Sequence, residues 1–158
     1  MHKIKIIAVG KLKEKFEIEA FEEFKKRLGA HCSLELVEIK EERLKDSPSE
    51  NEIKRALDKE AEKIFEHLKG QRYMVLAAEG ENVDGAQFAQ FLKVKTDCGE
   101  PLIFIIGSSF GLSDKVKRQA DKKISLSKLT FTHRFARIVL AEQLYRAFKF
   151  NSGGSYAK

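Results

Sequence analysis

Three short segments that follow apolar runs are the parts of this sequence best suited to hold a small ligand. They are residues 76–80, 107–111 and 126–131. If the apolar runs are parallel strands, their carboxyl ends meet at one edge of a sheet, and the three segments can line one pocket. Apolar walls with backbone donors and acceptors suit an adenine-like ligand. The glycine spacing is neither GxGxxG nor GK[ST], which disfavours a dinucleotide site and a P-loop. A tight strand-to-helix turn would explain the glycines of 107–111 equally well.

Other kinds of site find little support. The four histidines, at positions 2, 31, 67 and 133, show neither HxH nor HxxxH spacing, so we expect no metal site. The two cysteines, at positions 32 and 98, form no CxxC pair. Free, widely spaced cysteines suit a reducing compartment, and we expect a cytoplasmic protein.

The elements that must position these segments alternate along the chain. Strands are expected at 3–9, 34–39, 73–78, 102–106 and 124–126. Helices are expected at 18–28, 50–70, 85–98, 114–121 and 133–150, the last four beginning after the capping residues Ser49, Asp84, Ser113 and Thr132. This order predicts an α/β fold with a mostly parallel sheet and helices on both faces, in a single domain covering residues 1–158. Residues 102–106 are the most apolar segment and should form a central strand.

The last helix carries apolar residues on nearly every side. A helix of that kind must be buried all round. A second subunit could cover its outer face, which predicts a homodimer; the alternative is a central helix within a monomer. Glu142 lies on this helix and needs a partner, because an unpaired buried carboxylate is costly. Arg134, Arg137 and Arg146 are the candidates.

Positive charge is concentrated near the C-terminus. The chain has 30 basic and 24 acidic residues, a net charge of +6. Residues 115–158 alone hold 11 basic and 2 acidic residues. Such a one-sided excess predicts a polyanionic partner, nucleic acid first, although a basic face that serves solubility is the alternative. The longest apolar runs have about five residues, far fewer than the ~20 that span a bilayer, and no signal peptide is visible.

Several motifs resemble those of a known family. They are Ile7–Lys11, Phe104–Gly107 with Gly111-Leu112, Leu126–Thr130, His133–Arg137 and, most specifically, Val139–Phe148. Together they resemble the bacterial large-subunit ribosomal RNA methyltransferase H family, of the SPOUT class. The resemblance runs from about residue 4 to the C-terminus.

The resemblance implies a SPOUT fold with a C-terminal trefoil knot, and a homodimer. It implies methyl transfer from S-adenosylmethionine to N3 of a pseudouridine in 23S ribosomal RNA of the assembled ribosome, with no membrane partner. The cofactor contacts would be Leu76, Gly107, Leu126, Ser127, Lys128, Leu129, Thr130 and Phe131. The RNA would be met by His133, Arg134, Arg137 and Arg146, and Tyr156 is the candidate catalytic residue.

Three positions depart from the family pattern. Ser108 stands where the family usually has a second glycine, Arg134 stands where it usually has a proline after the histidine, and Ala157 stands where it usually has a histidine after the tyrosine. That histidine is a natural group to handle the N3 proton. A non-catalytic ribosome- or RNA-binding protein, and a methyltransferase with another RNA target, are therefore the alternative hypotheses.

Overall fold

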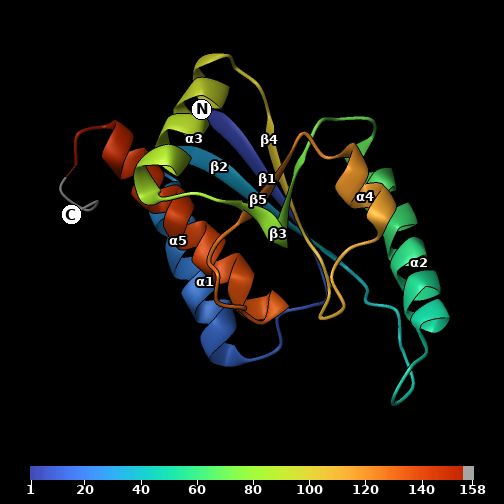
Figure 1. Cartoon of the computed structure of the whole chain (residues 1–158). Coiled ribbons are helices and arrows are strands. Elements are labelled where there is room, and N and C mark those ends of the chain that lie inside the picture. Colours follow the sequence, from blue (N-terminus) through green and yellow to red (C-terminus); the bar gives the residue numbers. More distant parts are fainter. Residues whose placement is uncertain (155–158) are drawn as a thin grey trace.

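The chain folds into one parallel sheet with helices on both faces, as the sequence predicts (Figure 1). The computed structural model describes residues 1–154. The strands are β1 (His2–Val9), β2 (Cys32–Ile39), β3 (Met74–Asn82), β4 (Leu102–Ile106) and β5 (Lys122–Ser125). The helices are α1 (Lys15–Leu28), α2 (Glu50–Leu68), α3 (Gly85–Asp97), α4 (Asp114–Gln119) and α5 (His133–Asn151). The strand order is β2-β1-β4-β3-β5, and every described pairing is parallel.

The expectation of a central, fully buried strand is confirmed. β4 lies in the middle of the sheet, and all five of its residues are buried. Alternate residues of β1 point to opposite faces, as strand geometry requires. Ile6 joins the core under α1, α3 and α5, whereas Ile7 joins the core under α2 and α4. Figure 1 shows these two helical layers on either side of the sheet.

The four helix starts predicted from capping residues are also confirmed. The hydroxyls of Ser49, Ser113 and Thr132 and the carboxylate of Asp84 each accept a hydrogen bond from a backbone N–H of the first helical turn. A polar side chain at this position satisfies a donor that the helix itself leaves unpaired. These caps fix where the loops between strand and helix end, and so they shape the edge of the sheet.

β3 is longer than the predicted 73–78. Its pairing with β5 shifts register between Leu76 and Glu81, and the strand then continues to Asn82. Gly80 lies so close to β5 that an added Cβ would be 2.7 Å from the backbone carbon of Ile124. The extra residues form a bulge, and three of them, Ala77, Ala78 and Glu79, line the cavity described below. An apolar run alone does not reveal such a bulge.

Helix α5 packs between α1 and α3 within the same chain. This placement buries five of its apolar residues, which are Ile138, Leu140, Ala141, Leu144 and Ala147. Phe135 and Phe150 stay 41% and 49% exposed. Glu142 pairs with Arg146 one turn away, which settles the partner among the three candidate arginines. Across residues 1–154, no helix is long and apolar enough to cross a membrane.

Candidate functional site

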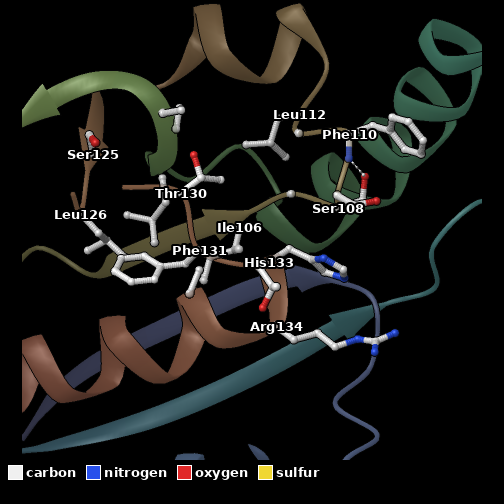
Figure 2. A pocket seen from close by; sticks show the side chains of 18 of the residues that line it. Ile106, Ser108, Phe110, Leu112, Ser125, Leu126, Thr130, Phe131, His133 and Arg134 are labelled. Carbon is white, nitrogen blue, oxygen red and sulfur yellow. Dashed lines mark hydrogen bonds between the residues drawn. The ribbon is translucent and has the colours of Figure 1, made fainter. Parts of the chain in front are cut away.

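A cavity of about 910 Å³ lies at the carboxyl ends of β3, β4 and β5. The three segments singled out in the sequence line it together, because parallel strands deliver their carboxyl ends to one edge. Figure 2 shows the apolar side chains of Ile106, Leu112, Leu126 and Phe131 around it. Its volume is near the upper end of the roughly 300–1,000 Å³ found for small-molecule pockets.

The turn after β4 requires a glycine at position 107. A Cβ there would lie 2.3 Å from the backbone oxygen of Gly111, which no side chain could tolerate. Ser108 and Gly111 close the turn through two backbone hydrogen bonds, of 3.2 and 2.9 Å. Gly107 is thus needed because two stretches of backbone meet, and the turn forms one wall of the cavity.

Ser108 is buried, and its side chain is engaged in the same turn. The Ser108 hydroxyl accepts a hydrogen bond from the Phe110 N–H at 3.3 Å, drawn in Figure 2. The serine that replaces the family's second glycine therefore has a local structural partner.

Two hydrogen bonds that involve serine hydroxyls hold the segment after β5 in place. Ser125 Oγ donates to the Ser127 carbonyl at 2.8 Å, and the Leu129 N–H donates to Ser127 Oγ at 3.0 Å. Of the six residues expected here, Leu126, Ser127, Leu129, Thr130 and Phe131 line the cavity. Lys128 is exposed and is absent from the lining.

The four residues expected to meet RNA have different surroundings. His133 and Arg134 line the cavity at the start of α5. Arg146 is partly exposed beside its partner Glu142. Arg137 is wholly buried, so the prediction that it contacts a phosphate is wrong. Tyr156, the candidate catalytic residue, lies outside the described residues.

Arg137 instead holds the end of β1 against α5. Its Nη1 donates to the Gly10 carbonyl and to Glu38 Oε2, both at 3.1 Å, and its Nη2 donates to the Val9 carbonyl at 3.3 Å. Glu38 Oε2 also accepts the Leu12 N–H at 2.8 Å. Burial lowers the pKa of Arg137, and the negative charge of Glu38 opposes that shift. The guanidinium is retained inside because its hydrogen bonds and its ion pair offset the cost of desolvation.

The charged residues of the cavity wall fall into two groups. On one side Lys117 and Glu79 form an ion pair of 2.8 Å, and this hydrogen bond holds the pKa of Glu79 below its usual value. On the other side lie His133, Arg134 and Glu17. Burial lowers the pKa of His133, so its imidazole is neutral at pH 7. Among residues 1–154 no group of His, Cys, Asp or Glu could hold a metal ion.

Sequence reasoning missed Glu17 as a wall residue. It precedes Phe21 by one turn of α1, on the face that becomes buried, and it is only 5% exposed. The sequence did hold a signal for this residue. Position 17 lies on the apolar stripe of the helix, where a carboxylate is unusual because charged residues are rarely buried without a partner. Leu112, which follows Gly111, was also missed as a lining residue.

Comparisons with known proteins agree on one family. A family model described as predicted SPOUT methyltransferase matches residues 2–157. A protein of Caldicellulosiruptor saccharolyticus named ribosomal RNA large subunit methyltransferase H is 44% identical over 156 residues, 98% of this chain and 99% of the relative. A protein of Streptococcus thermophilus with the same name is 43% identical over 158 residues, 99% of both chains.

A solved structure supports the fold independently. The crystal structure of a probable methyltransferase from Bordetella pertussis Tohama I superposes with a TM-score of 0.59, covering 92% of this chain and 96% of that one. At 15% identity, this similarity speaks for the fold alone.

Proposed function

Since the chain belongs to the SPOUT methyltransferase family, we propose that it transfers a methyl group from S-adenosylmethionine to N3 of a pseudouridine in 23S ribosomal RNA. Two relatives more than 40% identical over nearly the whole chain carry the name ribosomal RNA large subunit methyltransferase H. The proposed substrate is the assembled ribosome in the cytoplasm, and the proposed catalytic unit is the single domain of residues 1–158.

The observation that carries the proposal is the cavity itself. Its walls combine apolar side chains with the backbone of two ordered segments, 107–111 and 126–131. Aromatic and aliphatic walls with a few backbone donors and acceptors suit the adenosine part of the donor. Leu76, Gly107 and Leu126–Phe131 are the contacts we propose, with exposed Lys128 at the rim.

When bound, the donor supplies an electrophilic methyl carbon on a positively charged sulfur. Methyl transfer would form the bond from this carbon to N3 and break its bond to sulfur, the N3 proton would pass to water, and S-adenosylhomocysteine would leave. The chain contributes mainly position, because the methyl carbon must be held in line with N3. The rigid turn at Gly107 and the serine-braced segment after β5 are suited to that task. Tyr156 remains the residue that we propose near the target base.

We propose that the working form is a homodimer with the C-terminal trefoil knot of its class. Phe16 and Ile18 on α1 are 62% and 42% exposed, and Phe135 on α5, which packs against α1, is 41% exposed. Exposed apolar side chains clustered on adjoining helices are typical of an interface. A basic surface formed by two copies would bind the RNA. Arg146 and Lys128 are its proposed phosphate contacts, with His133 nearby.

Ala157 favours one further candidate, a non-catalytic ribosome-binding protein. Calorimetry with S-adenosylhomocysteine separates the two, because a purely RNA-binding protein would show no heat of binding. Mass spectrometry of 23S RNA from a deletion strain tests the reaction itself and separates it from a transfer RNA target. We expect N3-methylpseudouridine to disappear. If it persists in the deletion strain, the proposed reaction is wrong.

A further inference from the structure

The cavity has a second, charged end beyond its apolar walls. This end is formed by Glu14 and Glu17 at the start of α1 and by His133 and Arg134 at the start of α5. The helices α1 and α5 pack against each other, which brings the two starts together. Figure 2 shows the side chains of His133 and Arg134 extending to the same side of the chain, away from the ring of Phe131.

Three buried polar atoms at this end have no hydrogen-bond partner among residues 1–154. They are Glu17 Oε1, His133 Nε2 and Arg134 Nε. Leaving such groups unpaired is costly, and the cost is greatest for a charged one. The carboxylate of Glu17 is the most demanding of the three, because the residue is 95% buried (5% exposed). Unsatisfied charged groups in a cavity wall indicate that a ligand completes them.

The opposite rim of the cavity shows no such deficit. There Glu79 and Lys117 satisfy each other at 2.8 Å. The lining as a whole contains three carboxylates and two cationic side chains, so its net charge is −1. S-adenosylmethionine carries an ammonium, a carboxylate and a sulfonium, a net charge of +1, which complements that wall.

We propose that Glu17 and Arg134 form the subsite for the α-amino-acid end of the methyl donor. Glu17 would accept hydrogen bonds from the ammonium, and Arg134 would donate to the carboxylate. This inference rests on the proposed function, because it assumes that the apolar end of the cavity holds adenosine.

The mixed charge of the subsite argues against two other occupants. An RNA phosphate would pair with Arg134 but would be repelled by the buried carboxylate of Glu17. A uracil base is neutral and offers neither an ammonium to Glu17 nor a carboxylate to Arg134. An α-amino acid carries an ammonium and a carboxylate on the same carbon atom. Its ammonium can pair with Glu17 while its carboxylate pairs with Arg134.

The test is calorimetry on the full chain with three adenosine compounds. S-adenosylhomocysteine has both charged groups, its decarboxylated analogue keeps only the amine, and 5′-methylthioadenosine has neither. We expect Glu17→Gln to weaken the first two about 10- to 100-fold, the effect of losing a charged hydrogen bond. We expect Arg134→Met to weaken S-adenosylhomocysteine alone by a similar factor. Neither change should alter 5′-methylthioadenosine binding by more than about twofold.

The matched control is Glu19→Gln, an exposed carboxylate on the same helix that pairs with Lys15. It should bind all three compounds as the unchanged chain does. Glu17→Gln keeps the shape of the side chain, and circular dichroism checks that this variant is folded. The Arg134→Met measurement does not depend on whether the Glu17→Gln variant folds. The subsite is wrong if both changes weaken all three compounds alike or weaken none. If the unchanged chain binds no adenosine compound, the proposed function fails as well, which is a distinct result.

Discussion

The buried guanidinium of Arg137 connects three parts of the chain that are distant in sequence. It donates to the carbonyls of Val9 and Gly10 at the end of β1 and to Glu38 at the end of β2. Arg137 is 0% exposed, so water cannot replace these contacts. The interaction therefore holds the first strand-to-helix loop against α5, directly beside the cavity.

Replacing Arg137 with methionine fills most of the same volume but removes every donor. Two buried carbonyls and the Glu38 carboxylate then lose the guanidinium, although Glu38 Oε2 keeps its hydrogen bond from the Leu12 N–H. Removing one member of a buried pair typically costs about 3–5 kcal/mol. The loss of the ion pair at Glu38 adds less to this cost, because 28% of the Glu38 side chain is exposed and water can solvate it after the change. We expect the free energy of unfolding to fall by about 3 kcal/mol, which lowers the Tm by roughly 10 °C in a chain of this length.

Urea unfolding followed by circular dichroism measures this loss. The control is Arg72→Met, which removes an exposed ion pair: the Arg72 side chain is 73% exposed and lies 2.7 Å from Asp121. Exposed pairs of this kind contribute about 0–1 kcal/mol. If Arg137→Met costs no more than Arg72→Met, the assignment of Arg137 as a structural anchor is refuted.

Three further outcomes follow from the site and the core. Gly107→Val should abolish S-adenosylhomocysteine binding in calorimetry, because the new Cβ meets the Gly111 oxygen and the turn must open; normal affinity would count against the cavity. Burial lowers the folded-state pKa of His133 below its usual 6.5, so unfolding should become easier as the pH falls through 6.5 toward 5. His133→Gln should flatten that slope, and an unchanged slope would contradict it. Burial raises the pKa of Cys32 to about 11 whereas Cys98 is exposed, so iodoacetamide at pH 8 should label Cys98 alone until the chain is unfolded.

Much of the fold could be read from local patterns. The apolar run of 102–106 predicted a central strand, and capping residues such as Ser49 and Thr132 predicted where helices begin. These features depend on neighbours in sequence, such as side-chain period and a hydroxyl three residues before an N–H, and therefore need no tertiary information. The extension of β3 to Asn82 escaped prediction, because the bulge exists only through its pairing with β5.

The candidate site also has features that the sequence predicts and features that only the folded chain shows. The sequence by itself determined that segments 76–80, 107–111 and 126–131 line one cavity, because parallel strands send their ends to one edge. Only the tertiary structure decided the roles of the charged residues. Arg134 and Arg137 are three positions apart on one helix, yet Arg134 lines the cavity whereas Arg137 is buried against β1. The electrostatic role of a side chain depends on burial and on partners up to 128 positions away, and the chain acquires these only when it folds.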